Sequence, residues 1–168
     1  GVLTGSELTD VKITLIAGKG HLKHTEGGDF RQAATRAVRQ ALMKTSSILL
    51  EPYVRFQLTV PSESLSKALF DLESKKAQFE IQDNKDGRSV IFGRGCIRLL
   101  AHYQNEVSAY SKGQGRFAFK PDGYDVCQDT DEIVAHIGYD PEMDMCNPSS
   151  SVFCANGSGF TVTWDKAD

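Results

Sequence analysis

Two histidines and a lysine lie within four residues of one another near the start of the chain: His21, Lys23 and His24. A lysine ammonium donates to phosphate oxygens, and an imidazole can stack on a base or donate to a phosphate or a 2′-hydroxyl group. In a polar loop, these side chains indicate contact with RNA, and an ordinary solvated loop is the alternative. A zinc site on the two histidines is not favoured, because no further ligand lies close by.

A helix is predicted directly after this loop. Seven apolar residues recur with the helical period and form one stripe: Phe30, Ala33, Ala34, Ala37, Val38, Ala41 and Leu42. Gly27 and Gly28 allow a sharp turn into the helix, and Asp29 lies where the helix N-terminus favours an anion. Four basic residues lie off the stripe and could follow an RNA backbone or form a solvated face: Arg31, Arg36, Arg39 and Lys44.

A strand is predicted before the loop. Val11, Ile13 and Leu15 alternate with polar residues, which is the pattern of a half-buried strand. One strand and one helix leave a sheet unpaired. We therefore expect this chain to be a fragment of a longer protein, with half of its first domain upstream.

Residues 53–120 carry the order strand, helix, strand, strand, helix, strand, which is typical of a ferredoxin-like fold. Alternation over residues 54–60 predicts the first strand, and a proline at 61 suits the start of the first helix. The first helix is predicted from Leu65, Ala68, Leu69 and Leu72. The second and third strands are predicted at Phe79 and Ile81 and at residues 89–92, with an extension to Cys96. The second helix is predicted from Leu99, Tyr103, Val107 and Tyr110, and the last strand from Phe117 and Phe119.

The C-terminal part is predicted to hold a short helix over residues 130–138 and a loop-rich tail over residues 139–168. A last strand is favoured at residues 160–164, and the Asn156–Ser158 sequence is interpreted as a flexible loop. The tail aromatics Phe153, Phe160 and Trp164 are expected to dock onto the body of the protein, with a partner-binding patch as the alternative.

The net charge of −3 is unevenly distributed. Residues 1–50 hold seven basic and four acidic side chains, whereas residues 121–168 hold ten acidic side chains and Lys166 alone. This asymmetry suggests that only the first part meets phosphate. There is no apolar run of membrane-spanning length, and the four widely spaced cysteines are interpreted as reduced, mostly packing thiols of a cytoplasmic protein.

Catalytic motifs are absent from the sequence. It contains no G-x-x-x-x-G-K-[ST] phosphate-binding loop, no Gly-x-Ser-x-Gly elbow and no Cys/His signature. His102 and His136 are interpreted as surface or core-edge residues. We therefore predict no catalytic residue, no metal site and no cofactor for this chain.

A family resemblance rests on the order strand, histidine-bearing tip, helix, Leu49-Leu50-Glu51-Pro52 and new strand. This order resembles domain IV running into domain V of elongation factor G. The sequence from His21 to Gln32 resembles more closely the tetracycline ribosomal protection branch of that superfamily.

The resemblance covers roughly residues 1–138 and implies an α+β protein. Residues 1–50 would be a partial domain IV, a β-α unit like that of a ribosomal protein, with the tip loop at residues 18–28. Residues 53–124 would be a ferredoxin-like domain V. Residues 125–168 would form a C-terminal helix and a tail that packs back on the body.

The resemblance also implies a function. The chain would be the ribosome-binding C-terminal region of a monomeric, cytoplasmic translational GTPase that binds GTP and Mg²⁺ through absent N-terminal domains. Domain V would lie near the factor-binding site of the ribosome, and the tip would reach rRNA of the decoding region to dislodge tetracycline. His21 falls on the position of the tip histidine of elongation factor G. The residues expected to bind are Lys19, His21, Leu22, Lys23, His24, Thr25 and Arg31.

The tip also departs from the protection proteins that this branch contains. Their tip is rich in tyrosine, serine and proline, whereas residues 20–26 here contain no proline. Two alternatives therefore remain open. One is an elongation-factor-G-like translocation factor without resistance activity, and the other is a stand-alone ferredoxin-like interaction module.

Overall fold

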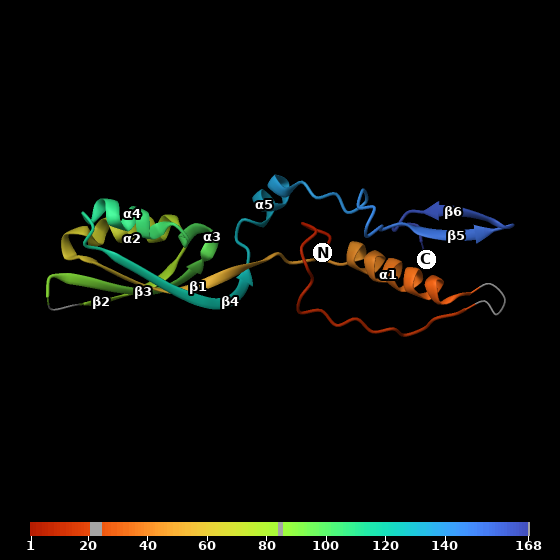
Figure 1. Cartoon of the computed structure of the whole chain (residues 1–168), viewed down its shortest axis with the longest axis horizontal. Coiled ribbons are helices and arrows are strands. Elements are labelled where there is room, and N and C mark those ends of the chain that lie inside the picture. Colours follow the sequence, from red (N-terminus) through yellow and green to blue (C-terminus); the bar gives the residue numbers. More distant parts are fainter. Residues whose placement is uncertain (21–24, 84–85, 168) are drawn as a thin grey trace. The chain divides into compact units, whose positions relative to one another are not determined.

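The computed structural model describes residues 1–20, 25–83 and 86–167. The chain forms two compact units, one of Gly1–Leu49 with Gln128–Asp168 and the other of Leu50–Cys127. The first unit contains one long helix, a short helix and a two-stranded hairpin, and the second contains a four-stranded sheet with helices (Figure 1). The chain is thus an α+β protein, as predicted.

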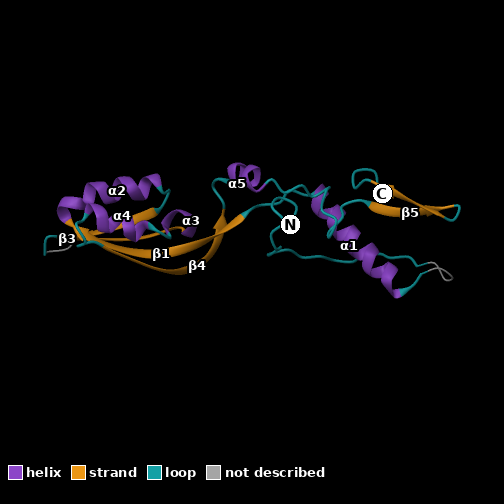
Figure 2. Ribbon diagram, turned by 45° about the horizontal axis from the view of Figure 1, so that its top comes forward, coloured by secondary structure: helices purple, strands orange, loops and turns teal. Residues whose placement is uncertain are grey.

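The second unit has the predicted ferredoxin-like topology. Its antiparallel sheet has the strand order β2-β3-β1-β4, and α2 and α4 lie together on one face of it (Figure 2). The elements in chain order are β1 (Leu50–Pro61), a 3₁₀ turn (Ser62–Ser64), α2 (Leu65–Ser74), β2 (Gln78–Asp83), β3 (Arg88–Cys96), α3 (Ile97–Leu100), α4 (Tyr103–Tyr110) and β4 (Arg116–Val126).

The core of this unit follows from the alternation along β1. Val54, Phe56, Leu58 and Val60 are all buried, because every second residue of a strand points to the same face of the sheet. The helices contribute Ala68 and Leu72 from α2 and Tyr103 and Val107 from α4 to the same cluster. Each fully buried large apolar side chain stabilises the fold by roughly 1.5–3 kcal/mol.

The second predicted helix is broken in the structure. α3 ends at Leu100 and α4 begins at Tyr103, and Leu100 rather than Leu99 is fully buried. Gly95 on β3 makes room for Leu100 in the core, because an added Cβ at this position would lie 2.8 Å from Cδ1 of Leu100.

In the first unit, α1 (Gly27–Lys44) begins within one residue of the predicted helix. A capping box fixes its start. The Glu26 side chain accepts from the backbone N–H of Asp29, and an Asp29 carboxylate oxygen accepts from the backbone N–H of Glu26 at 2.9 Å. Asp29 therefore does more than favour the helix dipole, because it satisfies a backbone donor before the first turn.

The predicted strand at Val11–Leu15 is wrong. Among residues 1–20 the structure has no strand, and the side chains of Val11, Ile13, Leu15 and Ile16 are 52%, 64%, 87% and 93% exposed. The alternating pattern is real, but a strand needs a neighbouring strand to bond with, and no described segment of this unit pairs with residues 11–20.

The tail holds more regular structure than predicted. After α5 (Thr130–Ile137), which matches the predicted short helix, β5 (Ser151–Ala155) and β6 (Ser158–Val162) form an antiparallel hairpin. Asn156 and Gly157 connect them with φ angles of 53° and 78°. These are the angles of a type I′ turn, so the Asn-Gly pair is a hairpin signal and not the flexible loop that was expected.

Three remaining features bear on function. In the described ranges, no helix is long and apolar enough to span a bilayer, and no three His, Cys, Asp or Glu side chains are grouped so as to hold a metal ion. None of the four cysteines forms a disulfide. The packing interpretation fits the buried Cys96 and Cys127, whereas Cys146 and Cys154 are exposed.

Candidate functional site

The predicted binding residues surround the loop that precedes α1. Lys19 and Arg31 are exposed and Thr25 is half-buried, while His21, Leu22, Lys23 and His24 lie outside the described residues. The two ends of the loop come together, because a Cβ at Gly20 would lie 3.1 Å from the Phe30 ring and 3.7 Å from Thr25. The backbone at Lys19 and Arg31 therefore flanks the base of the loop.

The basic face of α1 is not open as predicted. Arg36 Nη1 donates to the Ser150 carbonyl, and Gln40 Nε2 donates to the Trp164 carbonyl at 3.0 Å and to the Ala167 carbonyl. Arg39 is buried, with 6% of its surface exposed. Of the four basic residues, Arg31 and Lys44 are exposed, whereas Arg36 and Arg39 lie on the side of the helix that meets the tail.

The predicted apolar stripe of α1 is mostly exposed. Phe30 is 57% exposed, the alanines of the stripe are exposed, and Val38 and Leu42 are half-buried. The helical period was identified correctly, but the most buried residue of the helix is Arg39, and the polar side chains beside it bond to the tail.

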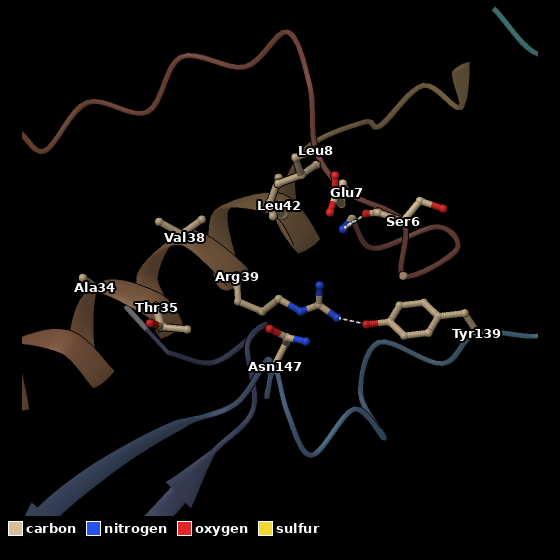
Figure 3. Close-up of a pocket in the computed structure, with 12 residues that line it drawn as sticks. Ser6, Glu7, Leu8, Ala34, Thr35, Val38, Arg39, Leu42, Tyr139 and Asn147 are labelled. Carbon is tan, nitrogen blue, oxygen red and sulfur yellow. Dashed lines mark hydrogen bonds between the residues drawn. The ribbon is translucent and has the colours of Figure 1, made fainter. Parts of the chain in front are cut away.

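Arg39 lies at the centre of this packing (Figure 3). Its Nη2 donates to the Tyr139 hydroxyl, which in turn donates to Asp144 Oδ2 at 2.5 Å. Arg39 Nη2 and Asp144 Oδ2 are 3.8 Å apart, and the guanidinium carbon lies 5.8 Å from the centre of the Tyr139 ring. We call Arg39, Tyr139 and Asp144 the tail clasp.

Asp144 is held as a carboxylate by several donors. Besides Tyr139, the backbone N–H groups of Cys146 and Asn147 donate to Oδ1, each at 2.9 Å. The Tyr139 hydrogen bond is the foremost cause that holds the pKa of Asp144 well below its usual range, and the Asn147 donors come next. Burial raises the pKa of Tyr139, so the hydroxyl stays protonated and can donate.

Acid should open the clasp. Since the pKa of Asp144 is depressed in the folded state, its stabilising contribution is present above the unfolded value of about 3.9 and is lost as the pH falls through the folded value. We expect NMR of the Asp144 carboxyl carbon to give a titration midpoint well below the value of about 3.9 for an unfolded chain. A midpoint at that unfolded value would contradict the clasp.

A cavity of about 720 Å³ lies beside Arg39 in the first unit. Its walls come from residues 1–8, from one side of α1 and from Tyr139 and Asn147 (Figure 3). It contains none of the predicted RNA-binding residues. Its lining also holds no nucleophile next to a base, so it does not resemble a catalytic centre.

A second charged cluster lies in the sheet of the other unit. Arg94 bonds to Asp122 at 2.6 Å and to Asp125 at 2.5 Å, and Arg55 lies 2.7 Å from Asp122. The hydrogen bond from Arg94 is the largest cause that lowers the pKa of each aspartate. These pairs join β1, β3 and β4 and are explained by the fold alone.

Sequence reasoning missed Tyr139 and Asp144, which engage a helix about 100 residues earlier in the chain. No local motif marks such a contact. The one available signal was the difference in charge, since a basic helix and an acidic tail in one small unit attract each other.

Two models of the same family match the chain in consecutive order. Elongation factor G, domain IV matches residues 1–46, and elongation factor G C-terminus matches residues 48–132. A tetracycline resistance protein, TetP of Clostridium perfringens, is 34% identical over 122 residues, which are 73% of this chain and 19% of that protein. The chain thus spans about a fifth of the length of this relative.

A crystal structure of a protein from Thermus thermophilus aligns with a TM-score of 0.49 at 19% identity, over 54% of this chain and 14% of that chain. The two family models together account for residues 1–132 apart from the single junction residue, and they divide the chain just before β1. This chain therefore belongs to the elongation factor G family, of which it carries domain IV sequence followed by the C-terminal domain.

Proposed function

We propose that this chain is the ribosome-binding part of a GTP-dependent translation factor, and that the loop at residues 18–28 contacts rRNA of the decoding region. The observation that carries the proposal is the match to elongation factor G domain IV over residues 1–46, which contain this loop. Exposed Lys19 and Arg31 at the base of the loop support it, because both can donate to phosphate.

The role of the chain is positional. The second unit docks near the factor-binding site of the ribosome, and the loop reaches toward the decoding region. In a protection protein this contact dislodges tetracycline, and the likeness to TetP favours that function. A translocation factor without resistance activity is the second candidate, which the proline-free tip with His21 favours. The match to domain IV gives a stand-alone interaction module no support.

Nucleotide chemistry lies elsewhere in such a protein. The sequence has no phosphate-binding loop, so the residues present do not fit GTP, and no step of its hydrolysis is assigned to them. We propose that further domains of a longer, monomeric, cytoplasmic protein bind GTP and Mg²⁺. The chain itself contributes contacts with the ribosome.

In the full-length protein, replacing Lys19 and Arg31 with alanine should weaken ribosome binding. Each lost phosphate contact reduces the slope of log K against log salt by about 0.7–0.9, so the double variant should lose up to about 1.8. Co-sedimentation with ribosomes at several salt concentrations measures this slope. The control is Lys12→Ala with Lys166→Ala, which removes two exposed positive charges outside the loop.

The two candidate functions give different results in cells. A sensitive host that expresses the full-length protein should tolerate more tetracycline if the protein protects ribosomes, and glycines in place of residues 21–25 should abolish that tolerance. Normal expression without tolerance would favour the translocation factor. An unchanged salt slope for the Lys19 and Arg31 variant would reject the proposed contact in either case.

A further inference from the structure

The tail lies outside the part of the chain that the family models match. The second match ends at residue 132, while the segment that packs on α1 runs from Tyr139 to Ala167. α1 carries four basic residues and Asp29, and residues 139–167 carry four acidic residues and Lys166. The two segments thus have opposite net charges of equal size.

The tail covers one continuous side of the helix. Arg36, Arg39 and Gln40 are spaced three and four residues apart, so they lie on the same face of α1. Arg31 lies eight residues before Arg39 and about 80° away from it around the helix, at the end that meets the loop. Arg39 therefore borders the basic surface that begins with exposed Arg31, and Arg36 lies farther around the helix.

We propose that residues 139–167 are a removable cover, and that the face of α1 beneath them binds the phosphate backbone of RNA once the tail lifts. This inference rests on the proposed function, because it extends the loop contact along the helix. The tail clasp holds the cover in place, and Arg36 and Arg39 are the phosphate contacts that it keeps from RNA.

The contacts under the cover are of a kind that RNA can replace. Arg36 donates to the neutral backbone carbonyl of Ser150, and Arg39 donates to the Tyr139 hydroxyl, while the Asp144 carboxylate lies 3.8 Å from Arg39, beyond hydrogen-bond distance. Arg39 Nε has no hydrogen-bond partner in the part of the chain that the structure describes, although it is buried. Phosphate oxygens are charged acceptors that bind a guanidinium more strongly than neutral oxygens do. An RNA strand can therefore compete for this face.

The test loosens the clasp in the full chain with two isosteric changes, Tyr139→Phe and Asp144→Asn. The matched control is Tyr124→Phe with Asp140→Asn, which removes the same groups from exposed positions outside the clasp. The probe is a fluorescent oligouridylate, titrated at several salt concentrations. Two new contacts to a single strand should steepen the salt slope by about 1.4, which tightens binding at 0.1 M salt by about 25-fold relative to the effect at 1 M salt.

A second measurement reports on the cover without RNA. An arginine-selective dicarbonyl reagent should modify exposed Arg31 in every variant and buried Arg39 only when the clasp is loosened. Mass spectrometry of the digested chain gives the ratio of the two. We expect Arg39 labelling to rise at least tenfold relative to Arg31 in the clasp variant and to stay low in the control.

Two results would overturn the proposal. If Arg39 becomes reactive but oligouridylate affinity and salt slope do not change, the tail stabilises the unit and does not cover an RNA-binding surface. If Arg39 stays protected, the clasp does not hold the tail. Failure of the proposed function gives a different result. Ribosome binding would then not depend on Lys19 and Arg31, while the ratio of Arg39 to Arg31 labelling would still rise in the clasp variant.

Discussion

Replacing Gly93 with alanine should destabilise the second unit by about 3 kcal/mol or more, at the upper end of the cost of overpacking. A Cβ at this position would lie 2.3 Å from Cζ of Phe56 and 2.5 Å from the carbonyl oxygen of Gln78. The Phe56 ring could turn away. The Gln78 carbonyl cannot, because β2 is held in register against β3 by the ladder from Gln78 to Asp83.

The matched control is Gly123→Ala in β4. No atom lies within 4 Å of a Cβ added there, but the φ angle of 76° strains an alanine and costs about 1–2 kcal/mol. Urea unfolding followed by far-UV circular dichroism, with hydrogen exchange of β1 amides as a local probe, should therefore rank Gly93→Ala as the more damaging change. Equal losses for both variants would mean that the sheet opens to make room.

The second unit could be predicted from its sequence because its core residues recur with the periods of strands and helices. The alternation around Phe56 and Leu58 identifies a strand with one buried face, and the residues opposite them in the sheet supply the partners. Even here the break between α3 and α4 was missed. Leu100 at the end of α3 packs against Gly95 of β3, and such a contact between two elements cannot be found from the pattern of either one.

The first unit was harder to predict because its packing is polar and long-range. The stripe from Phe30 to Leu42 has the period of a buried helical face, yet the structure buries Arg39 on the opposite side. Periodicity identifies the helix but does not say which partner covers it. Likewise Val11 to Leu15 has the pattern of a strand, and only a pairing partner would make it one.

The loop and the tail meet the same helix. The loop precedes the N-terminal end of α1, and the tail bonds to its polar side. A change in the tail can therefore alter how much of the basic surface is available next to the loop. For this reason the tail variants and the loop variants should be measured separately and then combined, since residues that share one surface do not contribute additively.

Tyr103→Ala should be the most destabilising single truncation of the second unit, at about 3–5 kcal/mol, because it leaves a large cavity in a close-packed core. The Tyr103 side chain is fully buried, and its ring meets that of Phe117 edge-on at 5.2 Å. Its hydroxyl lies 3.3 Å from that of Tyr110 and donates to the Ala68 carbonyl at 3.4 Å. Burial raises the pKa of Tyr103, so the hydroxyl is a neutral donor at any ordinary pH.

Tyr103→Phe separates the ring from the hydroxyl. The phenylalanine variant keeps the contact with Phe117 and loses only two long hydrogen bonds, so we expect a loss of about 1 kcal/mol. Chemical denaturation of both variants measures the difference. If Phe costs as much as Ala, the hydroxyl network between α2 and α4 holds the helices on the sheet. If it costs little, the packing of the Tyr103 ring on Phe117 holds α4 on the sheet.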